Sequence, residues 1–171
     1  LYTVTKKLKK LFRKVRGTLD SDPKNVSSFE AIVTDFFDYV LKHEISLKKY
    51  FKQKLTTLAE ERENNRNLFF RPVGLEILAR LYVHFSSQNA LSRLTSGLTR
   101  INFQNPGGVF DGILWSDGTI IARSKEKAAA VDLCLYMLGK LGDIGKQEQL
   151  QKRLCEIRKN PNYKLPPKVR P

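Results

Sequence analysis

The residues of this sequence that are best suited to chemistry are seven cations near its start. They fall within the first sixteen positions, where no aspartate or glutamate accompanies them. Clustered lysines and arginines can lie along phosphate groups, and each neutralised phosphate releases a counterion. The chemistry they favour is therefore contact with a polyanion, not a covalent reaction. The seven are Lys6, Lys7, Lys9, Lys10, Arg13, Lys14 and Arg16.

A second basic stretch closes the chain. Residues 146–170 contain eight cations and two acids, and we place further phosphate contacts on Lys152 and Arg153 within it. The intervening residues 17–145 are nearly neutral, with 16 basic and 15 acidic side chains. The net charge of +14 therefore arises at the two ends of the chain. Charge that is clustered in this way predicts nucleic-acid binding through those ends.

Two other partners would suit the basic helical pattern at the start of the chain. An anionic membrane surface or an acidic protein would attract the same cations. The apolar runs are broken by charge within a few residues, so we expect no membrane-spanning segment and no membrane partner. A protein-interaction scaffold that docks an acidic partner, or a missing N-terminal domain of its own, stays open as the alternative to nucleic-acid binding.

The sequence contains no recognisable pattern of nucleophile, general base or metal ligands. Cys134 and Cys155 lie among apolar residues without a CxxC spacing, which predicts reduced core thiols in a cytoplasmic protein. His43 and His84 have no partner at metal-ligand spacing, so we expect both on helix surfaces or in the core. We therefore predict no catalytic residue, no metal and no cofactor, and a binding module in preference to an enzyme.

Hydrophobic periodicity predicts the elements that must position the basic residues. The apolar positions of residues 1–19 form a helical stripe, and the cations cover the rest of that helix. Ser27 or Ser28 is expected to cap a second helix, and a third is expected over residues 46–62. We interpret the apolar residues 68–70 as a short, buried, extended piece.

The middle of the chain predicts two adjacent helices, over residues 72–85 and 87–101. Their lengths match a helix-turn-helix, in which Arg93 and Arg100 would lie on the exposed side of the second helix. Adjacent helices are also the commonest motif of any α domain. We therefore interpret this pair as structural and predict that neither arginine determines a base preference.

Residues 109–122 form the single β region of the sequence. The Ser116-Asp117-Gly118 turn separates residues of high β propensity, which predicts a hairpin. Trp115 in this hairpin could stack on a base, although its apolar neighbours favour a place in the core. Three elements are expected to follow: a buried helix over 128–141 that stops at Gly142, an amphipathic helix over 145–159 and an extended, mobile tail from residue 160.

These elements predict a mainly α fold with about six to seven helices and one small β-hairpin. We divide the chain into a basic amphipathic helix at 1–19, a helical core domain at 26–145 and a basic helix with an extended proline-rich tail at 146–171. Because the chain begins with Leu1 and not with Met, we expect a fragment or a processed product. Residues 1–15 do not resemble a signal peptide, because their cations alternate with the apolar residues.

One string in the middle of the chain resembles a known protein family. Residues 67–79, with the sequence NLFFRPVGLEILA, resemble a stretch in the C-terminal half of DGQHR-domain proteins. DNA sulfur-modification regulators of the DndB type belong to this family. The resemblance extends over residues 26–141, and its specific part consists of Phe70, Arg71, Pro72 and Gly74.

The resemblance implies a bacterial, DNA-associated regulatory module of a DNA-modification or defence system. Arg71 would be the cation of the family motif. The DGQHR motif itself belongs to an N-terminal half of the family and is absent from this sequence, so no activity of that half is carried over. The residues also leave a structural role open for Arg71, which could cap neighbouring carbonyl groups or pair with Glu76.

Overall fold

The computed structural model describes residues 23–53, 57, 60, 63, 67–104, 106–116, 118–121 and 123–169. Within these residues it contains six α-helices, one short 3-10 helix and a two-stranded antiparallel hairpin. The mainly α fold with a single small hairpin that the sequence predicts is therefore confirmed. The seven cations of residues 6–16 lie outside the described residues.

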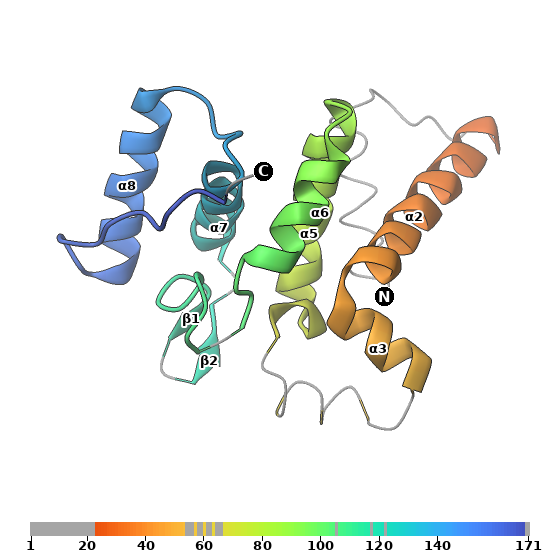
Figure 1. Ribbon diagram of the computed structural model, residues 1–171, viewed down its shortest axis with the longest axis horizontal. Helices are drawn as coiled ribbons and strands as arrows, with labels where there is room; N and C mark the ends of the chain where they lie inside the picture. The colour runs from red at the N-terminus through yellow and green to blue at the C-terminus, as the bar shows by residue number, and fades with distance from the viewer. Residues whose placement is uncertain are drawn as a thin grey trace.

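The helices lie side by side, with α2 and α3 at one end of the molecule and α8 at the other (Figure 1). The pair α5 and α6 occupies the centre, and α7 and the hairpin lie between this pair and α8 (Figure 1). None of the helices in the described part of the chain has the length and apolar character needed to span a bilayer. The six helices are α2 (Pro23–His43), α3 (Ile45–Gln53), α5 (Pro72–Ser87), α6 (Leu91–Arg100), α7 (Ser124–Met137) and α8 (Ile144–Arg158).

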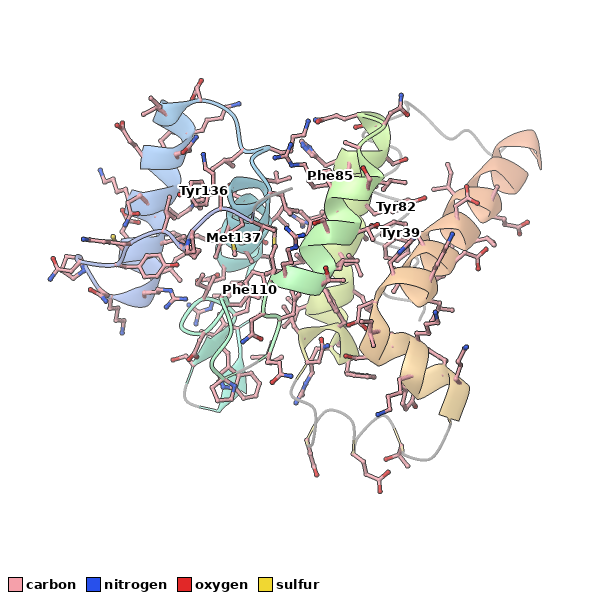
Figure 2. All side chains as sticks on the ribbon, in the orientation of Figure 1. Tyr39, Tyr82, Phe85, Phe110, Tyr136 and Met137 are labelled. Atoms are coloured by element: carbon pink, nitrogen blue, oxygen red, sulfur yellow. The ribbon has the colours of Figure 1, made fainter. Side chains whose placement is uncertain are left out.

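Helix α5 is the centre of the hydrophobic core, and most of its side chains are buried. Aromatic rings join it to α2: the ring centroids of Phe36 and Tyr82 are 5.4 Å apart, and those of Tyr39 and Tyr82 are 5.2 Å apart. Figure 2 shows Tyr39 and Tyr82 between the two helices. On its other side α5 packs against α7, whose Ala129 and Ala130 are fully buried and allow close approach of neighbouring elements.

The boundaries of the first two described helices differ from those expected. Helix α2 begins at Pro23, a favoured residue for a first helical position, so the caps predicted at Ser27 and Ser28 are wrong. Helix α3 ends at Gln53 instead of continuing to residue 62. Farther along, Thr57 and Glu60 form a reciprocal capping box, which is typical of the start of a new helix.

Residues 68–70 are buried as expected, but their predicted extended conformation is wrong. They form a 3-10 helix because Asn67 caps its start, with Oδ1 accepting the N–H of Phe69 at 2.9 Å. The N–H of Arg71 donates to the carbonyl of Leu68 at 3.0 Å and closes the turn. Asn67 is itself buried, and its Nδ2 donates to Glu44 and Ser46 at the α2–α3 corner.

Two later helices also begin or end at residues other than those predicted. Helix α6 begins at Leu91, not at Ser86 or Ser87, because α5 continues to Ser87 and Asn89 then adopts a left-handed conformation with φ of 52°. Helix α7 covers Ser124–Met137 and stops before Gly139, whose φ is 66°, so the stop predicted at Gly142 is wrong. Both Gly139 and Gly142 have positive φ, and the first along the chain ends the helix.

The predicted hairpin is present but shorter than residues 109–122. Strand β1 (Trp115–Ser116) pairs with β2 (Thr119–Ile120), with Trp115 opposite Ile120. Residues 109–114 form successive turns instead of a strand, since the N–H groups of Ile113 and Leu114 both donate to the carbonyl of Phe110. These three side chains are fully buried, so burial of apolar residues determines the conformation here.

The tail after α8 is extended, as predicted, but it is not free of the fold. Both ends of the Gln151 side-chain amide hold it: Nε2 donates to the carbonyl of Tyr163, and Oε1 accepts the N–H of Leu165 at 3.1 Å. The N–H of Val169 donates to the carbonyl of Met137 at 2.8 Å. The apolar side chains at these alternate tail positions pack against the core. The expectation of a mobile tail is therefore wrong for the described residues up to 169.

Replacing Gln151 with alanine is expected to loosen the tail and expose Cys155. The Cys155 thiol is half-buried and lies 3.6 Å from the Tyr163 carbonyl, so it depends on the tail for cover. We expect its rate of labelling by a maleimide to rise several-fold, whereas Cys134 stays unlabelled because it is fully buried. Labelling sites are assigned by mass spectrometry. An unchanged rate at Cys155 would show that the amide does not hold the tail.

Candidate anion-binding cleft

A cleft of about 790 Å³ opens between the end of α5, helix α7 and helix α8. We call it the anion-binding cleft because cations from more than one element line it. Its wall also contains two leucines and two glutamines, which combine apolar surface with neutral hydrogen-bonding groups. The lining residues are His84, Gln88, Asp132, Leu135, Lys140, Leu141, Gly142, Lys146, Gln149 and Arg153.

The turn between α7 and α8 positions the two lysines of the cleft. The N–H of Lys140 donates to the Leu135 carbonyl at 2.7 Å, which fixes the backbone just after α7. Asp143 then caps α8, and its Oδ1 accepts the N–H of Lys146 at 3.0 Å. Gly142 between them has a φ of 106°, a conformation that favours glycine. The turn therefore places one cation on each side of the start of α8.

The charges of the cleft are not balanced. Arg153 forms an ion pair with Asp132 of α7, and both side chains are about 30% exposed. Lys140 and Lys146 have no ion-pair partner among the residues that the structure describes. Two ammonium groups thus remain available to a ligand, since the acid of the cleft is already paired. Unpaired cations that share one concave site attract anions.

His84 contributes a polar ring to the same wall. Burial lowers its pKa below the ordinary histidine value, and the nearby Lys140 ammonium lowers the pKa further. The ring is therefore neutral at physiological pH and offers one N–H donor. The amide Nε2 of Gln88 donates to its Nε2 at 3.1 Å, which places the ring proton on Nδ1.

The structure places Lys152 and Arg153, the two predicted phosphate contacts of α8, on different faces of the helix. Arg153 lines the cleft, whereas Lys152 is exposed on another face of the helix, with Glu148 and Glu156 four residues before and after it. Glu156 already pairs with Lys125 at 3.1 Å. The face that contains Lys152 therefore has mixed charge, which is typical of an ordinary solvated helix surface. The predicted contacts in residues 6–16 lie outside the described residues.

The four residues of the family motif form a structural corner at the start of α5. Phe70 is buried, Pro72 is the first residue of the helix, and Gly74 packs directly against the Leu68 carbonyl. Arg71 has the extended backbone expected before a proline, with φ of −111° and ψ of 144°. Its guanidinium carbon lies 6.0 Å from the centre of the half-buried Trp115 ring. This corner is not part of the cleft lining.

The arginines of the predicted helix-turn-helix lie in different environments. Arg100 is exposed at the end of α6, as expected. The exposed position predicted for Arg93 is wrong, because this residue is half-buried and its guanidinium extends toward Gly139 at the end of α7. Arg93 thus contacts the core side of its helix, in line with our interpretation of the pair as structural.

The cleft includes three basic side chains, those of His84, Lys140 and Lys146, that sequence reasoning did not select as site residues. Lys140 and Lys146 lie on either side of a helix boundary, and a cation on each side of such a break is the signal that could have found them. His84 lies more than fifty positions earlier in the chain, and no local pattern links it to them. Among the described residues no group of three or more potential ligands could hold a metal ion. The cleft presents ammonium and amide donors, which are groups that can bind an anion.

Comparison of the chain with protein-family models, with curated proteins and with solved structures finds no match in any of the three. The function of the cleft is therefore inferred from its own geometry and charge. The resemblance of residues 67–79 to DGQHR-domain proteins stays a prediction.

Proposed function

We propose that this chain is a DNA-associated binding module that contacts phosphate groups and performs no reaction itself. The observation that supports the proposal is the anion-binding cleft, where Lys140 and Lys146 lie without an acidic partner among the described residues. The net charge of +14 also supports the proposal, because it raises the local concentration of a polyanion around the molecule. The basic residues 6–16 are a second proposed contact, predicted from the sequence.

The wider role that we propose is regulatory. The resemblance to DGQHR-domain proteins favours a bacterial DNA-modification or defence system as the setting. A cleft with two unpaired lysines would allow the module to position DNA or another component of the system. The residues around Arg71 would have a structural role in this module, because they form the corner at which α5 begins.

A protein-interaction scaffold is the second candidate, and the surface of α3 favours it. Ile45 and Phe51 of this helix are 68% and 55% exposed, and they are two of the three large apolar side chains that the described residues leave exposed. Exposed lysines at positions 48, 49 and 52 lie on the same helix. Apolar and basic groups together would suit an acidic protein partner.

The two candidates predict different effects of salt and of cleft variants. We expect Lys140→Gln with Lys146→Gln to weaken binding of a 5′-phosphorylated single-stranded DNA oligonucleotide. The slope of log affinity against log salt should flatten by up to about 0.7 for each phosphate that the variant no longer neutralises. Fluorescence anisotropy in a salt series measures both quantities. Lys164→Gln is the matched control in the same stretch of chain, because this exposed lysine lies outside the cleft, and we expect it to leave the slope unchanged.

The N-terminal cations are tested in the same series. Replacing Lys6, Lys7, Lys9 and Lys10 with glutamine should weaken binding to all DNA sequences alike, because phosphate contacts contain no sequence information. A slope near zero for the unaltered chain would contradict a phosphate-dominated mode. Wild-type affinity in both variant sets would remove the cleft and the N-terminal residues from the interface and favour the scaffold on α3.

A further inference from the structure

The unpaired charge of the anion-binding cleft lies beside the α7–α8 turn and does not continue along α8. Lys140 and Lys146 both flank the α7–α8 turn. Farther along the cleft face of α8 lie Gln149, which is neutral, and Arg153, whose charge is already paired with Asp132. A strand that continued along this face would meet no further unpaired cation among the described residues, so its internal phosphates would gain little attraction there. The arrangement therefore suits a ligand whose charge ends in the cleft.

A terminal phosphate matches this arrangement better than an internal one. A phosphomonoester has a charge of about −1.5 to −2 near neutral pH and three acceptor oxygens. An internal phosphodiester has a single negative charge and two free oxygens. The two unpaired ammonium groups of the cleft balance the charge of the monoester, and the amides of Gln88 and Gln149 supply further donors.

The size of the cleft agrees with this choice. Its volume of about 790 Å³ lies within the range of about 300–1,000 Å³ that is usual for small-molecule sites, so it can accommodate a terminal nucleotide together with its phosphate. Leu135 and Leu141 supply apolar surface against which a sugar or base can pack. The His84 ring adds a flat face on the same wall.

From this geometry we infer that the anion-binding cleft recognises a phosphomonoester, in the form of the terminal phosphate of a nucleic-acid strand. The inference rests on the proposed function, since it names the chemical group that the same cleft takes. It adds a preference for strand ends over strand interiors. Lys140 and Lys146 are the residues that confer this preference.

The test compares four probes of one base sequence by fluorescence anisotropy at constant salt. They are single-stranded oligonucleotides with a 5′-phosphate, with a 3′-phosphate or with hydroxyl groups at both ends, and the matching deoxynucleoside monophosphate as a competitor. We expect at least one phosphorylated strand to bind about tenfold more tightly than the unphosphorylated strand, because the extra charge faces two ammonium groups. Lys140→Gln with Lys146→Gln should abolish this difference, and Lys164→Gln, at an exposed lysine outside the cleft, should retain it. Thermal unfolding of each variant confirms that it is folded.

Three other outcomes would each overturn part of this inference. Equal binding of phosphorylated and unphosphorylated strands, weakened by the double variant, would overturn the preference for ends and leave the proposed function standing. Failure of every oligonucleotide to bind would overturn both. Competition by the mononucleotide at the affinity of the phosphorylated strand would overturn the strand end as the source of the phosphate and identify a free nucleotide instead.

Discussion

Replacing Gly74 with alanine is expected to lower the free energy of unfolding by about 3 kcal/mol. Gly74 lies in the first turn of α5, where an added Cβ would come within 2.1 Å of the Leu68 carbonyl oxygen. This oxygen belongs to the backbone, so rotation of a side chain cannot relieve the clash. The 3-10 helix and α5 would have to separate, and both belong to the buried core.

Gly145→Ala is the matched control for this substitution. Gly145 also lies in the first turn of a helix, but it is exposed, and its added Cβ would only approach Asp143 Oδ1 at 3.6 Å. Alanine has the higher helix propensity, so this variant should be as stable as the original chain or slightly more stable. Chemical denaturation of both variants gives the comparison.

The result also bears on the family motif. A strongly destabilised Gly74→Ala variant would explain the glycine of the Phe70-Arg71-Pro72-Val73-Gly74 string as a requirement of close packing. A variant as stable as the original chain would contradict the close approach of Gly74 and Leu68. The glycine would then need a functional explanation, such as contact with a ligand at this corner.

Replacing Glu76 with glutamine is expected to cost about 3 kcal/mol of stability. Glu76 is 5% exposed, and its Oε1 accepts from Arg80 at 2.8 Å while its Oε2 accepts from Lys127 of α7 at 3.0 Å. Glutamine keeps the shape of the side chain, but an NH₂ donor would replace one of the two acceptors and face a cation. Lys127 is only 12% exposed, so solvent cannot compensate for the missing carboxylate charge.

Glu156→Gln is the control for the removal of one carboxylate charge. Glu156 pairs with Lys125 at 3.1 Å, and both side chains are more than half exposed. Exposed pairs of this kind contribute about 0–1 kcal/mol, so little change is expected. Similar unfolding midpoints for the two variants would contradict the view that Glu76 joins α5 to α7. Replacing both Glu76 and Lys127 with apolar residues should recover part of the stability, because no buried charge then stays unpaired.

Local patterns in the sequence were sufficient for the fold class. The 3.6-residue spacing of apolar side chains located most helices, and the turn signal at Ser116-Asp117-Gly118 located the hairpin, because both depend on residues that are close in the chain. Errors occurred where two signals competed over a short distance. Gly139 and Gly142 are both able to end α7, and serines at the end of α5 resemble caps of the next helix.

Other features depended on contacts that local patterns do not contain. The apolar triplet at 68–70 forms a 3-10 helix because the buried Asn67 caps it and joins it to the α2–α3 corner. The tail is docked because Gln151 binds its backbone at two residues. The contacts of Asn67 with the corner and of Gln151 with the tail join residues more than ten positions apart, so the identity of the partner is not visible from the spacing of nearby residues.

What the sequence determined by itself is the mainly α class and the basic character of both ends. Only the tertiary structure decided which cations share a site. It separated Lys152 from Arg153, paired Arg153 with Asp132 and brought His84 to the wall that contains Lys140 and Lys146. The physical reason is that charge is a property of composition, whereas a cleft arises from the packing of helices that are distant in the chain.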